Sequence, residues 1–527
     1  MRKGFTLIEL LGIIILIGII GLIAVPAVTN LVQSSKERMY DNQVAMIKGA
    51  AKKWAVQNVN ELSESKPVFL SIDKLIKEGT IQQNDVKDPR RGNQNMNGCV
   101  VIEFDKNYKS YQYQYIEDEC TLLVSVGEYN ENKKVNSPKI VTGLTPVKWE
   151  DGTWVETTEN DPEWYDYDNK KWANARTKDG SMWVWIPRYV YNISSGWHQQ
   201  DEAPIDIRFS IVTDDTIGGT TTIVNTGKAN DSNGTWTNHP AFTFGDKELT
   251  GIWYAKFEAT AREDVESKTS WGCYNSDNSI DKHVKIIPNA NSWRCIFIGN
   301  MFTVSRNMET DDAYGWGTNG EGIDTHLAKN IEWGAAAYLS QSKYGKMEEV
   351  WRNNSNIYMT GCAGTAVYGA SFAGCQNTYE TLDGQQASTT GNITGIYDMS
   401  GGSWEFVSGH LDNNHPVFTT WAKSIIDADQ KYSDLYPVTV DSALTNYENS
   451  KNLKGDAVYE TSSSKDGETS WYGDLAWPHE KDNAWYLRGG FWNDHGGDAG
   501  LFHFAQNDGD RYSYFGFRPV LVVGDGL

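Results

Sequence analysis

The side chains best suited to recognising another molecule are concentrated near the C-terminus. Between Phe491 and Phe515 the sequence consists largely of Tyr, Asn, Asp, His and Gly. Rigid aromatic rings combined with adaptable hydrogen-bonding groups are the composition of antibody-like binding loops. The alternative is an ordinary polar loop that ends a domain. The predicted ligand-contacting residues are Phe491, Asn493, Asp494, His495, Asp498, His503, Phe504, Asn507, Asp510, Tyr512 and Tyr514.

Patterns typical of catalysis are weak elsewhere in the chain. Residues 315–320 fit the spacing GxGxxG, but residues 309–314 do not have the pattern of a preceding strand, so no dinucleotide site is predicted. No GxSxG or CxxC motif occurs, and the nine histidines are scattered, which argues against a nucleophile elbow and a zinc site. We therefore expect no cofactor. Acidic runs such as 159–163 predict solvated surface, with a structural Ca²⁺ site as the alternative.

The cysteines fall in three pairs of sequence neighbours. Neighbour pairing is only one of many possible connectivities, so the disulfides are not fixed by the sequence. The alternative for each cysteine is a buried thiol. The pairs are Cys99 with Cys120, Cys273 with Cys295, and Cys362 with Cys375.

Composition restricts the classes of partner. Lys and Arg number 47 against 69 Asp and Glu, so the formal net charge is −22. An acidic surface repels phosphate backbones, and nucleic acid is therefore not an expected partner. The 21 Trp, 27 Tyr and 49 Gly of the 527 residues are typical of a loop-rich protein with aromatic anchors.

Two segments that flank the C-terminal stretch have the composition of a rigid scaffold. Glycines permit close backbone approach, and tryptophans bury a large area. Arg518 is predicted to form a structural ion pair with Glu405 or Asp398. The predicted structural residues are Trp404, Arg488, Gly489, Gly490, Trp492, Gly516, Phe517 and Arg518.

These segments resemble the paired signatures of the formylglycine-generating-enzyme (sulfatase-modifying factor) family, a branch of the C-type lectin fold. The matching residues are Asp398-Met399-Ser400-Gly401 with Trp404-Glu405, then Arg488-Gly489-Gly490 and Gly516-Phe517-Arg518. The resemblance spans roughly 143–527 and is poor near 259–320. It implies two catalytic cysteines after the Gly-Gly pair, but Asp494 and Ala499 occupy the matching positions. Copper–thiolate chemistry needs those thiolates, so no enzyme activity is expected.

The same arrangement resembles the variable proteins of diversity-generating retroelements. In that group a mutable segment lies at the C-terminus of a C-type-lectin fold, between a Gly-Gly start and a Gly-Phe-Arg end. The resemblance implies mutation at adenines, which cannot produce Lys, Glu, Gln, Trp or Met from the usual codons. From Asn493 to Phe515 only Gln506 lies outside the reachable set. A segment of variable ligand-binding residues, 491–515, is therefore expected.

The N-terminus carries a sorting signal. A nearly uninterrupted apolar run from Leu10 to Val28 is long enough to span a bilayer, and Arg2 and Lys3 before it predict an external C-terminus. Gly4-Phe5-Thr6-Leu7-Ile8-Glu9 resembles the class III leader of type IV prepilins. This implies cleavage after Gly4 by a prepilin peptidase, methylation of Phe5, and assembly with other pilin subunits through Glu9. A cleaved signal peptide is the alternative.

The predicted fold class is α+β, with a long N-terminal pilin helix and a small α+β head before a large, loop-rich C-type-lectin domain. The expected parts are a leader, 1–4; a transmembrane or filament-core helix, 5–28; a pilin-like globular part, 29–125; a linker, 126–142; and the large domain, 143–527. Tyr40, Val44, Ile47, Ala51 and Trp54 predict a core-facing helical stripe. Strands are expected at 100–102, 111–115, 182–189 and 249–258. A helix is expected at 326–344, with Asp324 or Thr325 as its N-cap and His326 as a capping or packing residue.

Together these features predict a cell-surface, pilin-like adhesin or receptor. It would bind an external protein or glycan through its C-terminal face, diversified by a retroelement. One alternative is a structural minor pilin with a large head. The other is a secreted relative of the formylglycine-generating oxidase.

Overall fold

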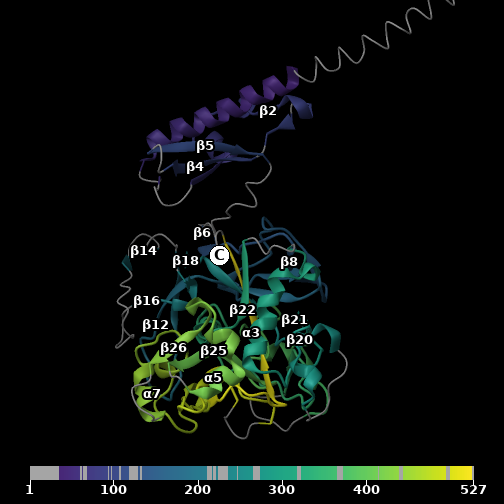
Figure 1. Cartoon of the computed structure of the whole chain (residues 1–527), viewed down its shortest axis with the longest axis vertical. Coiled ribbons are helices and arrows are strands. Elements are labelled where there is room, and N and C mark those ends of the chain that lie inside the picture. The colour runs from purple at the N-terminus through teal and green to yellow at the C-terminus, as the bar shows by residue number, and fades with distance from the viewer. Residues whose placement is uncertain are drawn as a thin grey trace, which may run out of the picture. The chain divides into compact units, whose positions relative to one another are not determined.

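The chain divides into two compact units, Met1–Ser125 and Val126–Leu527 (Figure 1). The division places residues 126–142, the predicted linker, in the second unit, where Val135 is buried in the core. The computed structural model describes residues 35–59, 62, 68–92, 94–96, 98–105, 109–117, 129–130, 133–210, 216–217, 221–222, 236–245, 247–264, 273–316, 322–364, 372–412, 415–437, 443–493 and 499–524.

In the first unit a helix lies along a small antiparallel sheet (Figure 1). Residues 35–57 are helical, and the sheet has the strand order β1-β4-β5. The predicted helical stripe and the two predicted strands are confirmed, because three of the five stripe residues are buried in this core and the other two pack against it. The elements are β1 (Val68–Ser71), α2 (Ile72–Lys77), β2 (Lys87–Asp88), β3 (Gln94–Asn95), β4 (Cys99–Asp105) and β5 (Ser110–Ile116).

The second unit is built around a seven-stranded antiparallel sheet. Its centre is formed by strands rich in Trp, Tyr, Ile and Val, which are buried on both faces. Strands were predicted at 182–189 and 249–258, and β11 and β19 confirm them. The order is β22 (Ile323–Leu327), β30 (Pro519–Val523), β19 (Gly251–Ala255), β11 (Met182–Pro187), β10 (Asn174–Thr177), β8 (Leu144–Glu150) and β9 (Thr153–Glu156).

A five-stranded sheet positions the C-terminal segment. Its longest strand, β25, pairs antiparallel with β27 and parallel with β26 and β29. Strand β28 continues the sheet beyond β27. The strands are β25 (Trp404–Asp412), β26 (Asp434–Pro437), β27 (Trp485–Arg488), β28 (Phe504–Asn507) and β29 (Phe515–Phe517).

The remaining elements of the second unit are short. One three-stranded sheet joins β13 (Asp206–Phe209), β12 (Tyr189–Asn192) and β16 (Thr237–Asn238). Five strand pairs are β6 (Tyr129–Asn130) with β7 (Val135–Asn136), β14 (Thr216–Ile217) with β15 (Thr221–Thr222), β17 (Thr243–Phe244) with β18 (Lys247–Glu248), β20 (Thr260–Ala261) with β21 (Val284–Lys285), and β23 (Cys362–Ala363) with β24 (Asn377–Thr378). The helices are α3 (Ile298–Asn307), α4 (Asn330–Ser340), α5 (Pro416–Trp421), α6 (Lys423–Ile426) and α7 (Ala443–Ser450).

This architecture shows that the predicted fold class is wrong. The described chain consists mostly of small sheets with few helices, and no long N-terminal pilin helix is among the described residues. The predicted helix at 5–28 and the processing residues Gly4, Phe5 and Glu9 lie outside them. Turn-forming Gly, Asn, Asp and Ser recur every few positions in the second unit, and they divide its described part into strands of two to nine residues.

The helix predicted at 326–344 begins later than expected. Residues 323–327 form β22 and pair with β30, so His326 lies opposite Val520 in the sheet. Helix α4 starts at Asn330, with Lys329 at the N-cap position instead of Asp324 or Thr325. His326 is fully buried, with Nδ1 2.8 Å from Asp324 Oδ1 and Nε2 3.1 Å from Glu332 Oε1. Its ring is a packed, hydrogen-bonded part of the core.

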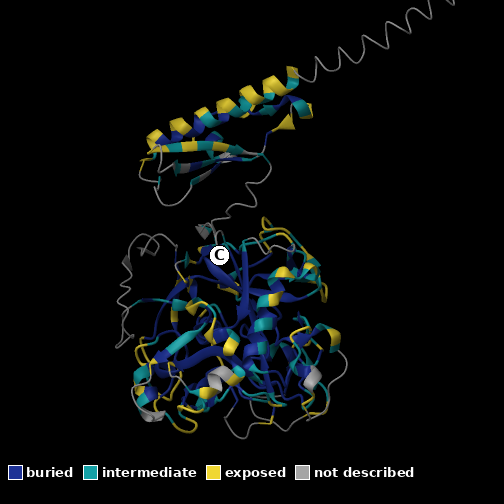
Figure 2. Cartoon of the chain, viewed as in Figure 1, coloured by how far each residue is buried: buried dark blue, intermediate teal, exposed yellow. Residues whose placement is uncertain are grey.

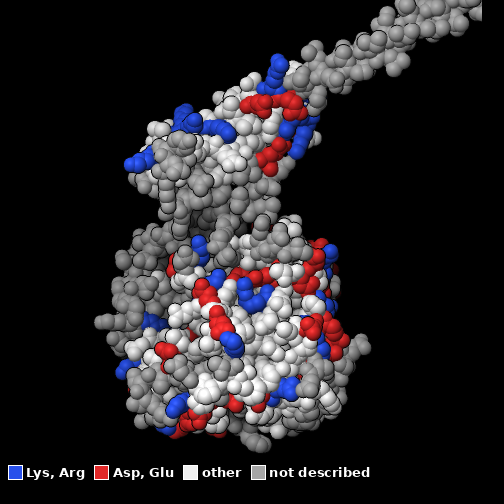
Figure 3. Space-filling model, in the orientation of Figure 1, with Lys and Arg blue, Asp and Glu red and all other residues white. Residues whose placement is uncertain are grey.

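In both units the residues of the core are buried and the loop residues are more exposed. Figure 2 shows the buried strands at the centre of the second unit and the exposed residues on its loops. On the face drawn in Figure 3, acidic and basic side chains occur in small groups with uncharged areas between them. Within the described residues, no helix has the length and apolar character needed to cross a bilayer.

Candidate ligand-binding surface

The structure separates the predicted contact residues into three groups. Asn493 and Tyr512 are exposed, Tyr512 to 39%, and Phe491, Asn507, Asp510 and Tyr514 are partly exposed. His503 and Phe504 are fully buried, which excludes them from contact with a ligand. Asp494, His495 and Asp498 lie outside the described residues.

The accessible rings form one cluster, here called the aromatic face, which consists of Trp404, Phe491, Tyr512 and Tyr514. The ring of Tyr514 lies 5.6 Å from both Phe491 and Tyr512, and Trp404 lies 5.7 Å from Phe491. Buried Phe515 stacks on Trp404 from within, at 5.7 Å. The face therefore joins the start and the end of the 491–515 segment on one surface.

The loop that carries Tyr512 and Tyr514 is held by backbone hydrogen bonds from other segments. Cys295 N donates to Tyr512 O at 3.1 Å, Ile298 N to Gly509 O at 3.3 Å, and Trp404 N to Tyr514 O at 2.9 Å. Gly509 has φ +94°, and a Cβ there would lie 3.0 Å from Ile298 Cγ2, so the turn requires glycine. The backbone is fixed while the side chains remain accessible.

Two disulfides reinforce the second unit, and one lies beside this loop. The bond Cys273–Cys295 joins the residue that contacts Tyr512 to a segment 22 residues earlier, and Cys362–Cys375 closes a second loop. Two of the three neighbour pairs are thus present, and Cys120 of the third pair lies outside the described residues. Arg294, next to Cys295, lies with its guanidinium 3.7 Å from the ring centre of Tyr358 and donates to Ser513 O.

Buried carboxylates contact the residues next to those of the aromatic face. Glu258 accepts hydrogen bonds from Ser403 N at 2.9 Å and Ser403 Oγ at 2.6 Å, and also from Ser292 Oγ. Burial, followed by the charges of Glu405 and Asp398, raises the pKa of Glu258 well above its usual range. A protonated Glu258 can therefore bridge the segments on either side of the face.

Asp398 supports the neighbouring backbone. Its carboxylate accepts from Gly361 N at 2.8 Å and Asn353 Nδ2 at 2.9 Å, and burial raises its pKa. Asn353 O in turn accepts from Gly402 N at 2.8 Å, and Gly402 O accepts from Trp492 N at 3.0 Å. The chain of bonds links the central motif to the start of the C-terminal segment.

Arg518 forms the predicted ion pair, and the structure pairs it with Glu405. Its Nε lies 2.6 Å from Glu405 Oε2, its Nη2 contacts Oε1, and Nη1 donates to Ala255 O at 3.2 Å and Tyr397 O at 3.1 Å. Both side chains are buried. Burial raises the pKa of Glu405 to about 7 although Arg518 lowers it. The pair locks β25 to the residues that lead into β30.

The other predicted structural residues surround this pair. Arg488 is buried and donates to Ala457 O at 3.1 Å. Gly489 and Gly490 have φ +81° and +70°, as the tight turn requires. A Cβ on Gly516 would lie 2.2 Å from Ser403 Oγ. Trp492 and Phe517 are buried. The scaffold role expected of these residues agrees with their burial.

Sequence reasoning missed part of the surface. Trp404 was predicted only as scaffold, although it is partly exposed within the face. Phe297 and Trp421 stack at 4.5 Å, and the guanidinium of Arg511 lies 5.2 Å from the Phe297 ring centre, which extends the aromatic surface. These rings come from distant segments, so no local pattern could have grouped them with 491–515.

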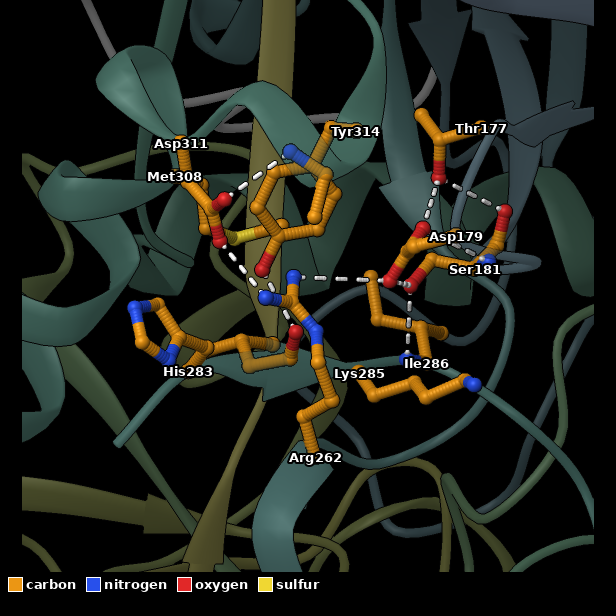
Figure 4. Close-up of polar contacts among 12 residues, drawn as sticks. Thr177, Asp179, Ser181, Arg262, His283, Lys285, Ile286, Met308, Asp311 and Tyr314 are labelled. Atoms are coloured by element: carbon orange, nitrogen blue, oxygen red, sulfur yellow. Dashed lines mark hydrogen bonds and ion pairs between the residues drawn. The ribbon is translucent and has the colours of Figure 1, made fainter.

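A separate cavity of about 510 Å³ opens beside β10. Next to it, Arg262 Nη1 donates to Asp311 Oδ2 at 2.7 Å, and Nη2 lies 3.6 Å from Asp179 Oδ2 (Figure 4). Asp179 also accepts from Thr177 Oγ1 at 2.8 Å and Ser181 Oγ at 2.9 Å. No cysteine, serine or histidine is among the described residues that line the cavity. Arg176 pairs with Glu156 and Arg262 with Asp179, which is typical of a structural cross-link. The lining residues are Gly143, Thr145, Glu156, Arg176, Thr177, Lys178, Asp179 and Gly180.

Comparison with known proteins yields no relative: neither a protein-family model nor a curated protein matches the chain. Among the described residues, no three His, Cys, Asp or Glu side chains are grouped as a metal site requires. The case for function therefore depends on the residues and their geometry.

Proposed function

We propose that the chain is a cell-surface receptor or adhesin that binds an external ligand through the aromatic face and the loop residues beside it. The observation that supports this most is a group of four adjoining rings, one exposed and three partly exposed, on a backbone held by Cys295, Ile298 and Trp404. A soluble domain normally buries such rings, so a cluster of them at the surface favours a binding role.

The geometry is favourable for affinity. Tyr and Trp are the residues that most often dominate binding energy, because they bury much area with few rotatable bonds. The fixed backbone lowers the ordering cost of association, which otherwise subtracts from affinity. Asn493, Asn507 and Asp510 lie in the same segment and would supply hydrogen bonds at the rim.

Surface display is proposed from the N-terminal sequence. The apolar run 10–28 would anchor the chain, and the likeness of residues 4–9 to prepilin leaders supports processing by a prepilin peptidase and association with other pilin subunits. Export agrees with the disulfides Cys273–Cys295 and Cys362–Cys375, since disulfides persist in oxidising compartments.

We also propose that a retroelement diversifies the segment 491–515. Exchange of Phe491, Asn493, Asp510, Tyr512 or Tyr514 would alter the contact surface and spare the core, since these residues are at least partly exposed. Exchange of buried His503 or Phe504 would disturb packing. Variation is therefore expected at the accessible positions and not at the buried ones.

Binding without catalysis is the proposed mode of action. Ala499, at one of the positions where the formylglycine-generating family has a catalytic cysteine, is buried and apolar. The other such position, Asp494, carries a carboxylate that cannot act as a thiolate. The side chains around the aromatic face are those of recognition.

The test compares cells that display the full chain with cells that display a face variant, Phe491→Ser with Tyr512→Ser and Tyr514→Ser. A matched control carries Leu382→Ser and Trp477→Ser, which replace exposed apolar residues outside the face. Adherence is measured on an array of immobilised proteins and glycans. Each hot-spot ring contributes about 2 kcal/mol or more, so the face variant should lose at least about tenfold in affinity for any target that wild type binds.

The control should bind as wild type does. Equal binding by the face variant, or adherence by none of the three, would contradict the proposal. Loss of filaments on deletion of the chain, without any face-dependent adherence, would instead support a structural minor pilin.

A further inference from the structure

The turn that leads into Tyr512 carries two partly exposed carboxylates, Asp508 and Asp510. Asp510 N donates to Asp508 Oδ1 at 3.0 Å, and Arg511 N donates to Asp510 Oδ1 at 2.7 Å. These bonds hold both side chains at fixed positions in the turn. Burial, followed by the charges of Asp508 and Asp510, raises the pKa of Tyr512.

The two carboxylates are not neutralised by an ion pair within the described part of the chain. No Lys, Arg or His nitrogen of the described residues is paired with Asp508 or Asp510 in a salt bridge. The one cation in the same turn is Arg511, and its guanidinium lies against the ring of Phe297, 5.2 Å from the centre. The turn that ends at the accessible Tyr512 therefore carries two carboxylates whose charge no described cation offsets, both hydrogen-bonded to the backbone at 510 and 511.

Aromatic rings around the loop already accommodate guanidinium groups. Arg294 lies 3.7 Å from the ring centre of Tyr358, and Arg511 covers Phe297. A cation within about 6 Å of a ring centre is attracted by the negative face of the ring. The ring of Tyr512 remains 39% exposed and is stacked with Tyr514. An incoming cation could make the same contact there.

Building on the proposed function, we infer that the aromatic face takes a basic segment of a protein ligand, with Arg or Lys side chains over Tyr512 and Tyr514 and paired with Asp508 and Asp510. Charge complementarity favours this occupant over a neutral glycan, whose hydroxyls can donate hydrogen bonds to the carboxylates but cannot neutralise their charge. The net charge of −22 would also attract a basic ligand over a distance set by the ionic strength.

The test uses the full-length chain and a fluorescent octa-arginine peptide, with octa-glutamate and a neutral Gly-Ser peptide of the same length as references. Anisotropy is measured in 50 and 300 mM NaCl, about a twofold change in screening length. The variants are Asp508→Asn with Asp510→Asn, Tyr512→Ala, and Tyr512→Phe. Asparagine keeps an oxygen for the backbone bonds, so the loop should retain its shape.

A matched control, Glu150→Gln with Asp151→Asn, removes two exposed carboxylates from the β8–β9 turn. Octa-arginine should bind more tightly than either reference peptide and more weakly at 300 mM NaCl. The Asp508/Asp510 variant should lose about fivefold and Tyr512→Ala about threefold, as expected for exposed ion pairs and a cation–ring contact. Tyr512→Phe keeps the ring face and loses only the hydroxyl, so its loss should be smaller than that of Tyr512→Ala. The control should bind as wild type does.

Equal losses in the control and the Asp508/Asp510 variant would overturn the inference, because binding would then follow the overall charge. Lack of preference for octa-arginine would also overturn it. The results distinguish failure of the basic-ligand inference from failure of the proposed binding function. Face-dependent adherence to a neutral target, unaffected by salt, would leave the proposed function standing and refute the basic ligand. Peptide binding that ignores every face variant, with no face-dependent adherence, would refute both.

Discussion

Removal of the guanidinium of Arg518 should destabilise the second unit strongly. The variant Arg518→Met would leave Glu405 buried without its bidentate partner, and a broken buried pair costs about 3–5 kcal/mol. Ala255 O and Tyr397 O would also lose their donor, at about 1 kcal/mol each. The expected loss in unfolding free energy is therefore roughly 5 kcal/mol.

The double variant Arg518→Met with Glu405→Leu separates the ion pair from simple packing. With both charges removed no ion remains buried, so most of the loss should be recovered, leaving about 1–2 kcal/mol from the two carbonyls. Urea unfolding, followed by tryptophan fluorescence and circular dichroism, compares wild type with Arg518→Met, Glu405→Leu and the double variant. The cycle isolates the coupling energy between the two side chains.

The pH dependence gives a second readout. The pKa of Glu405 is about 7 in the folded protein, which is above its value in the unfolded chain. The stability that protonation of Glu405 adds is therefore complete below the unfolded pKa and is lost as the pH rises through about 7. Because Arg518 lowers that pKa, the single variant should lose further stability as the pH rises above 7. Losses that simply add in the double variant, or a single-variant loss below about 1 kcal/mol, would refute the buried-pair reasoning.

Three further outcomes follow from the scaffold. Replacement of both Cys273 and Cys295 by Ser should lower the free energy of unfolding by about 3 kcal/mol for a loop of this length. It should also speed amide hydrogen exchange at Tyr512, measured by mass spectrometry. Unchanged exchange would show that the disulfide does not support the loop that carries Tyr512. Burial raises the pKa of Asp456 to about 7, so stability should fall as pH rises from about 4 to about 7. Asp456→Asn should flatten that fall in urea titrations, and an unaltered slope would exclude this group. Gly516→Ala would bring a Cβ to 2.2 Å from Ser403 Oγ, so the melting temperature should fall by several degrees; an unchanged melting temperature would show that the contact relaxes freely.

The buried elements were the most predictable part of the fold. The stripe that includes Ile47 and Trp54 has a helical period, and it forms the expected helix. The run at 182–187 is apolar throughout, and it forms the expected buried strand. The start of α4 was misjudged because the predicted helix begins with His326 and Leu327, whereas residues 323–327 pair with β30, 200 residues away at Ile323↔Val523. Non-local pairing overrides a local pattern of that length.

The binding surface was predictable only in part. The composition of 491–515 indicated recognition, yet His503 and Phe504 are buried because β28 pairs with β27 inside the second unit. Polar character alone could not separate a core histidine from an accessible one. Trp404 joins the face across a distance of more than 80 residues in sequence, measured to Phe491, and only the folded chain brings the two rings to 5.7 Å.

Sequencing of codons 487–518 in a clonal culture and its relatives, with a search for a near-identical template repeat, tests the central claim most directly. The account predicts substitutions at adenine positions of the template. They should fall at Phe491, Asn493, Asp510, Tyr512 and Tyr514, with the codons for the buried scaffold residues of the segment unchanged. An invariant segment without a template copy, or substitutions spread equally over buried and exposed positions, would contradict a diversified ligand-binding face.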